Sequence, residues 1–242
     1  ESLAKGMYLT ASTVAKWESG RQVPKEDQIR ELLSRLSFPT TDELVQRILE
    51  DLVNGEMPPE WSGIWLGSEQ KASDLRSYDL FAVNGLLQTP EYARAVLAYN
   101  RHTPVDLETR LQSRLERQQV LHQDDPPMAV FIFDEFALRR RVGGDEVMTD
   151  QITRILELAQ RPNIIIQMIE SGTEYYSGCP FTMAKLDGIE LAFIDDVLSG
   201  RVIEDPEEVN SISRIWESIR AEARPQKESL QLIERAAESW KN

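Results

Sequence analysis

Two short apolar segments in the second half of the chain constrain the fold more than any other feature. MAVFIFD (128–134) and NIIIQMI (163–169) are rich in β-branched and aromatic residues, and each is too short for an independent helix. Both are therefore predicted to be buried strands. The amphipathic segment between them predicts a helix over residues 145–160, so strands and helices alternate in this part of the chain.

A hairpin and several amphipathic helices complete this part of the sequence. Asp187-Gly188 is the strongest hairpin signal in the chain, and the segments 180–186 and 189–194 on either side are predicted strands. Helices are predicted over 68–77, from Pro90 to about 99 with Thr89 as N-cap, over 106–121, from Pro206 to about 223, and up to about Trp240. The expected fold is α+β, with about four strands covered by helices.

The segment NGEMPP (54–59) marks the border between two predicted domains. Asn-Gly followed by Pro-Pro interrupts any helix. Before this border the sequence contains short helical segments that begin after capping residues and end near glycine or before proline. We therefore expect an all-α domain over residues 1–54 and an α+β domain over residues 55–242.

The beginning of the chain has the pattern of a helix-turn-helix. Leu3 and Ala4 supply an apolar anchor and a small contact residue in the first helix, and an apolar turn leads to a second helix capped by Thr10. In that second helix Val14 and Trp17 are three residues apart, so both are expected to face inward. The remaining side chains form an outward face.

This outward face predicts a contact with DNA. A helix start can hold a phosphate, a hydroxyl or a lysine can read base edges, alanines allow close approach, and cations beyond the helix can contact the sugar-phosphate backbone. The predicted DNA-binding residues are Thr10, Ala11, Ser12, Ala15, Lys16, Arg21 and Lys25. One short helix contacts too few base pairs for useful specificity, so a homodimer on a double-stranded DNA operator is expected.

The charge of the chain is unevenly distributed. The net charge of −14 argues against a nonspecific polyanion binder. Residues 1–38 carry six Lys/Arg against five Asp/Glu, whereas residues 39–242 carry 21 against 36. A near-neutral head on an acidic body suits a small DNA-reading domain whose nonspecific affinity is limited.

The first 24 residues, ESLAKGMYLTASTVAKWESGRQVP, resemble the helix-turn-helix of the lambda-repressor/Cro (XRE) class. The matching positions are Leu3, Ala4, Thr10, Thr13, Val14, Trp17, Glu18, Gly20, Arg21 and Pro24. The resemblance implies a further helix before Leu3-Ala4 that this sequence does not contain, so the head is expected to be incomplete at its N-terminus. Tyr8 stands where many members of the class have glycine in the turn.

Four later segments resemble one family of actinobacterial regulators. They are YDLFAVNGLLQTPEYARAVL (78–97), RLERQQVLHQDDPP (114–127), DEFALRRRVGGDEVM (134–148) and VIEDPEEV (202–209). Members of that family carry the same DNA-binding head followed by an effector domain of poorly defined function. The resemblance implies a transcription regulator that often works with a small partner protein.

Two groups in the second domain are candidate ligand or partner sites. Arg139, Arg140 and Arg141 precede a Gly-Gly pair and a helix start, where they could bind an anion or an acidic partner; ion pairing within this acidic domain is the alternative. Tyr175 and Tyr176 could line a pocket, or could belong to an ordinary loop that enters a strand.

Other classes of protein lack support in the sequence. His102 and His122 are the only histidines, no cysteine lies near them, and a zinc site needs about four ligands. No glycine-rich phosphate loop or nucleophile–base pair is recognisable, so neither a cofactor nor an enzymatic activity is expected. No apolar run reaches about 18 residues, so no membrane span is predicted. The single Cys179 suits a reducing cytoplasm.

Together these features predict a cytoplasmic, sequence-specific DNA-binding transcription regulator. The helix over residues 10–19 enters the major groove, and the second domain senses a protein partner or a ligand. A protein partner is favoured because the surface is acidic and the sequence reveals no convergent polar residues. The alternative is an antitoxin-like interaction module, in which the second domain binds a small partner protein and DNA binding is secondary autoregulation.

Overall fold

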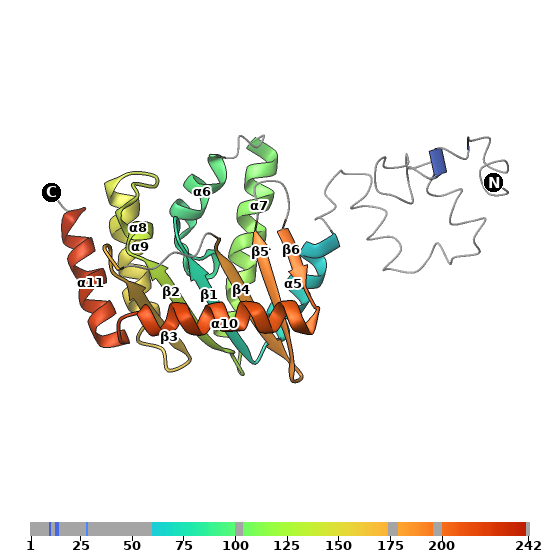
Figure 1. The fold of residues 1–242 in the computed structure, drawn as a ribbon. Coiled ribbons are helices and arrows are strands. Elements are labelled where there is room, and N and C mark those ends of the chain that lie inside the picture. The colour runs from blue at the N-terminus through green and yellow to red at the C-terminus, as the bar shows by residue number, and fades with distance from the viewer. Residues whose placement is uncertain are drawn as a thin grey trace. The chain divides into compact units, whose positions relative to one another are not determined.

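The computed structural model describes residues 60–99, 104–173, 179–195 and 200–240, together with residues 10, 13, 14 and 28. The chain divides into two units, Glu1–Glu60 and Trp61–Asn242. The second unit has an α+β fold (Figure 1), as predicted. The predicted domain border at residue 54 lies outside the described residues and stays a prediction.

A mixed sheet of six strands forms the centre of the second unit. The strand order is β3-β2-β1-β4-β5-β6. The strands are β1 Asp74–Asp79, β2 Met128–Asp134, β3 Ile164–Ile169, β4 Phe181–Leu186, β5 Ile189–Asp195 and β6 Gly200–Ile203. β1, β2 and β3 pair in parallel, whereas β4, β5 and β6 follow in antiparallel pairing. The four predicted strands are present, and β1 and β6 are two further strands that were not predicted.

The described helices agree with the predicted segments except at three places, one of which is the short helix over Phe136–Arg139 that was not predicted. They are α5 Glu60–Lys71, α6 Pro90–Ala98, α7 Pro104–Arg117, α8 Phe136–Arg139, α9 Asp145–Leu158, α10 Pro206–Glu222 and α11 Gln226–Ser239, with short 3-10 helices η1 Gly85–Leu87 and η2 Gln118–His122. The helix predicted over 68–77 is wrong, because α5 ends at Lys71 and β1 follows. The helix predicted over 106–121 ends its α-helical part at Arg117 and continues as η2.

The two faces of the sheet carry different helices (Figure 1). α10 crosses one face, and its Trp216 packs there with Tyr78 and Ile132 of the sheet. The opposite face carries a larger apolar cluster, which includes Leu75 and Phe131 and to which α5, α6, α9 and α11 contribute. Because successive strand residues point to opposite faces, the neighbours Phe131 and Ile132 belong to different clusters.

Short capping and turn motifs fix the ends of these elements as predicted. The Thr89 side chain accepts a hydrogen bond from the backbone N–H of Tyr92 and caps α6, whose first residue is Pro90. The β4–β5 hairpin turns at Asp187 and Gly188, whose φ angles are 49° and 83°. Within the part of the chain that the structure describes, no helix is long and apolar enough to cross a membrane.

Candidate ligand-binding site

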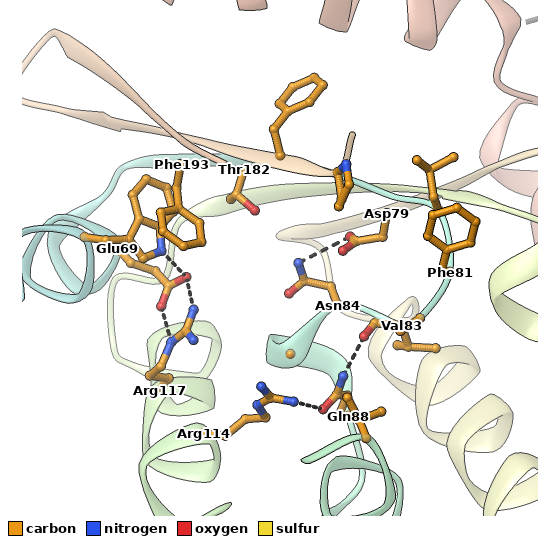
Figure 2. Close-up of a pocket in the computed structure, with 17 residues that line it drawn as sticks. Glu69, Asp79, Phe81, Val83, Asn84, Gln88, Arg114, Arg117, Thr182 and Phe193 are labelled. Atoms are coloured by element: carbon orange, nitrogen blue, oxygen red, sulfur yellow. Dashed lines mark hydrogen bonds and ion pairs between the residues drawn. The ribbon is translucent and has the colours of Figure 1, made fainter. Parts of the chain in front are cut away.

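A cavity lies beside the carboxyl end of β1 (Figure 2). Its volume is about 260 Å³, and residues of α5, β1, α7, β4 and β5 line it together with the 80–85 segment and Gln88. The strand order reverses between β1 and β4. Ligands of open α/β sheets commonly bind outside the carboxyl ends of parallel strands, next to such a reversal. The fold therefore places this cavity where a ligand site is expected.

Asp79, the last residue of β1, is half-buried at the wall of the cavity. Its Oδ2 accepts hydrogen bonds from Ser77 Oγ at 2.9 Å and from Asn84 Nδ2 at 3.3 Å. Burial raises the pKa of Asp79 to about 7, although the hydrogen bonds from Ser77 and Asn84 act in the opposite direction. Among the described residues, no cation lies within ion-pair distance of this carboxyl.

Asn84 joins the end of β1 to the segment that follows it. Its Oδ1 accepts a hydrogen bond from the backbone N–H of Leu86 and so caps η1. Its Nδ2 also donates to Ser77 Oγ at 2.8 Å. One side chain therefore fixes the start of η1 and orients both polar groups at the end of the strand.

Three buried glutamine side chains hold the segment around η1 in place. Gln88 donates to the carbonyl of Val83 at 2.7 Å. Gln118 and Gln151 donate to further carbonyls within 85–88 at 2.8–2.9 Å. Buried carbonyls that lack a partner are costly, so these amides stabilise one conformation of the segment. The cavity wall is thus preorganised.

An ion pair closes the α5 side of the cavity. Glu69 is 2% exposed, and its two carboxylate oxygens accept hydrogen bonds from Arg117 Nε at 2.9 Å and Nη2 at 2.8 Å. Trp65 Nε1 also donates to Glu69 at 3.3 Å, and the Trp65 ring stacks on Phe193 with centroids 5.2 Å apart. Because the bidentate pair compensates both charges, this side adds an aromatic surface without net charge.

Two more arginines lie near the cavity, each with a different neighbour. Arg114 Nη1 donates to Gln88 Oε1 at 3.0 Å at the base of the cavity in Figure 2. Arg140 lies over the ring of Phe81, with its guanidinium carbon 5.5 Å from the ring centroid. Phe81 lines the cavity and is nevertheless 54% exposed. Phe81 therefore combines an exposed ring with a cation–π contact at this site.

The lining residues offer both polar and apolar groups to a ligand. The described part of the chain contains no group of three His, Cys, Asp or Glu side chains that could hold a metal ion. The cavity lining, as far as the described residues form it, includes one hydroxyl side chain, that of Thr182, whose Oγ1 lies 3.1 Å from Ser77 Oγ. The lining also combines one carboxyl that lacks a cation with aromatic and aliphatic surface. Such a combination favours recognition of a small molecule.

The predicted arginine site is not assembled as one site. Arg139 pairs with Glu135 at 2.6 Å, and Arg141 pairs with Asp145 at 2.9 Å. The alternative of ion pairing within the domain is therefore confirmed for these two. Of the three, Arg140 is the one that contacts a cavity residue. Tyr175 and Tyr176, the other predicted ligand or partner residues, lie outside the described residues.

Thr10 is the one predicted DNA-binding residue that the structure describes. Its Oγ1 accepts a hydrogen bond from the backbone N–H of Thr13 at 3.1 Å, and Thr13 and Val14 are helical. The predicted N-cap at Thr10 is therefore confirmed. The other predicted DNA-binding residues, Ala11, Ser12, Ala15, Lys16, Arg21 and Lys25, lie outside the described residues.

Sequence reasoning missed the cavity because it missed β1. A helix over 68–77 would place Glu69 and Ser77 on helix faces and leave Asp79 in a loop. In the structure, DLRSYD is a strand whose alternate residues Leu75, Ser77 and Asp79 point to the helix-rich face. The sequence contained one signal of the cavity. If residues 74–79 are assigned as a strand, the polar residue Asp79 stands at the end of that strand, where a ligand site is expected.

Comparison with known proteins places most of the chain in one family. Residues 65–235 match a family described as a domain of unknown function (DUF5753). No curated protein and no solved structure matches the chain. The matched segment contains every residue of the cavity and more than half of the sequence. The chain therefore belongs to the DUF5753 family.

Proposed function

We propose that the protein is a sequence-specific DNA-binding transcription regulator whose DUF5753 domain senses a small molecule. In this proposal the helix that begins at Thr10 enters the major groove, and a homodimer contacts two half-sites. The remaining DNA contacts come from Ser12, Lys16, Arg21 and Lys25. The resemblance of residues 1–24 to the XRE class supports this assignment.

The observation that carries the sensing role is the preorganised cavity at Asp79. Its polar residues are held by hydrogen bonds within the domain, and such internal hydrogen bonds reduce the ordering cost of binding. The sequence suggested no convergent polar residues and so favoured a protein partner. The convergence of Asp79, Asn84 and Gln88 on one cavity favours a small molecule instead.

Selection of DNA fragments from a genomic library tests the DNA-binding role. We expect the parent protein to enrich a short palindrome, because two copies of one helix read related half-sites. The double variant Ser12→Ala/Lys16→Ala should fail to enrich it. The matched variant Ser211→Ala/Lys227→Ala, at two exposed positions of the second unit, should enrich it like the parent. Recovery of the same palindrome by the first variant would contradict the assigned helix.

A further inference from the structure

The chemistry of the cavity narrows the class of molecule that it can accept. We propose that the cavity binds a small organic cation, namely a protonated amine with an apolar body, and that Asp79 is its counter-ion. This inference deepens the proposed sensing role and rests on it for its biological meaning. The binding itself is a property of the cavity and can be measured without DNA.

The charges around the cavity leave Asp79 as the position for a cation. The other described ionisable side chains that line the cavity are Glu69, Arg114 and Arg117. Glu69 and Arg117 already form a bidentate pair, so that carboxylate is compensated. Among the described residues, Asp79 has only neutral donors, Ser77 and Asn84. A half-buried carboxyl with neutral partners is stabilised in its charged form when a cation binds beside it.

The rest of the cavity suits the apolar body of such a ligand. Trp65, Phe81, Val83, Val96 and Phe193 all line it. The cavity volume of about 260 Å³ lies at the small end of the range of ligand pockets, which is roughly 300–1,000 Å³. Aromatic rings also attract cations through their faces. A ligand with one ring and one amine therefore matches both the size and the lining.

The raised pKa of Asp79 supplies a second signature of the same contact. At pH 6 a carboxyl with a pKa of about 7 is mostly protonated in the free protein. An ammonium group that binds there favours the ionised carboxylate, so binding releases a proton into the buffer. The described charged or titratable groups around the cavity are Glu69, Arg114 and Arg117 of the lining, Tyr92, whose hydroxyl accepts a hydrogen bond from the backbone N–H of Val83, and Arg140 over Phe81.

Three matched probes test the charge preference on the full chain. They are 2-phenylethylamine, the neutral 2-phenylethanol and the anionic phenylacetate, which share one ring and one short linker. Binding is followed through the indole N–H signal of Trp65 in NMR spectra, assigned with a Trp65→Phe variant. We expect the amine to bind about tenfold more tightly than the alcohol, the factor expected for one charge-assisted hydrogen bond. Calorimetry at pH 6 in two buffers of different ionisation enthalpy should show proton release with the amine alone.

The variant Asp79→Asn separates the charge from the shape of the site. It should lower the affinity for the amine about tenfold, to that of the alcohol, and abolish proton release. Asp134→Asn is the matched control, since Asp134 ends the neighbouring parallel strand β2 and does not line the cavity. That control should bind the amine like the parent. Circular dichroism verifies that both variants fold.

Several results would overturn the inference. They are equal binding of amine and alcohol, preference for phenylacetate, unchanged amine binding by Asp79→Asn, and no shift of Trp65 with any probe. A preference for phenylacetate would identify the cavity as an anion site at Arg114. None of these results bears on the DNA selection, which tests the regulator role separately. Loss of DNA recognition would likewise leave the probe titrations interpretable.

Discussion

At the scale of single residues, the cavity is governed by how its charges are compensated. Glu69 is almost fully buried, yet its charge is balanced by the bidentate contact with Arg117. Asp79 is less buried, but within the part of the chain that the structure describes it has only a hydroxyl and an amide as donors. Compensation, and not burial alone, therefore decides which of these carboxyls is available to a ligand.

Because no cation compensates the charge of Asp79 among the described residues, the free energy of unfolding of the protein without ligand should depend on pH. Its folded-state pKa of about 7 is above the ordinary value of 3.8, so the folded state holds a proton that the unfolded state releases between these values. The contribution of Asp79 to stability is therefore fully present below about pH 4 and is lost as the pH rises through 7. The free energy of unfolding of the parent, relative to Asp79→Asn, should fall by roughly 1.4 kcal/mol per pH unit across this window.

Urea unfolding at a series of pH values, followed by circular dichroism, measures this difference. Above about pH 8 the difference should be constant, and Asp79→Asn should be more stable there than the parent, because the amide avoids a poorly solvated charge. Asn can still accept the hydrogen bonds from Ser77 and Asn84. A pH-independent difference between the two proteins would show that Asp79 is not perturbed.

Single residues were predicted from the sequence only where a local motif defines their role. The caps at Thr10 and Thr89 depend on hydrogen bonds to backbone groups three residues away, and both are confirmed. The ion pairs of Arg139 and Arg141 are equally local, since both partners are four residues away. Glu69 and Arg117 are 48 residues apart in sequence. Nothing in the sequence near either one indicates that long-range contact.

At the scale of elements, two strands with an apolar sequence and the two strands of the Asp187-Gly188 hairpin were predicted, and the others were missed. β2 and β3 are apolar on both faces because helices cover both sides of the sheet, and their sequences show this directly. β1 contains Asp, Arg and Ser because its ends lie beside the cavity and beside Glu190. β6 is only four residues long. Polar function and short length both remove the pattern on which strand prediction depends.

Two glycines in different backbone conformations allow a test of the hairpin as an element. Gly188 has a φ of 83°, and no atom lies within 4 Å of the point that a Cβ would occupy, so Gly188→Ala should destabilise the protein by about 1 kcal/mol through backbone strain alone. Gly67 lies within α5 and has equally open space, so Gly67→Ala should stabilise the protein by about the same amount through helix propensity. Urea unfolding of both variants measures the two effects.

Because the same atom is added at both positions, opposite signs would attribute each effect to backbone conformation. Destabilisation by both substitutions would instead point to lost contacts. A Gly188→Asn variant refines the result, since Asn tolerates the left-handed region better than Ala. It should recover part of the stability that Gly188→Ala loses, without any change at the cavity.

At the scale of the whole molecule, the separation of charge along the chain determines how the proposed regulator would meet DNA. Residues 39–242 carry most of the negative charge, whereas residues 1–38 are close to neutral. The acidic part repels a duplex at long range and opposes nonspecific binding. The affinity for DNA must then come from the few Lys and Arg side chains of residues 1–38. The salt dependence of operator binding should therefore be limited and should reflect the number of these side chains that contact phosphates.

The salt dependence of operator binding tests this count. If Lys16, Arg21 and Lys25 of each head neutralise phosphates, a homodimer makes about six such contacts, and the logarithm of the binding constant should fall against the logarithm of salt concentration with a slope of about −5. Lys25→Ala removes one contact from each head and should reduce the slope by about 2, whereas Lys227→Ala on α11 should leave it unchanged. Fluorescence anisotropy of a labelled operator over a range of potassium chloride concentrations gives these slopes. Counterion release depends on the number of phosphates neutralised and not on the net charge of the protein. A slope near zero for the parent, or the same slope for Lys25→Ala as for the parent, would therefore show that these side chains do not contact the phosphate backbone.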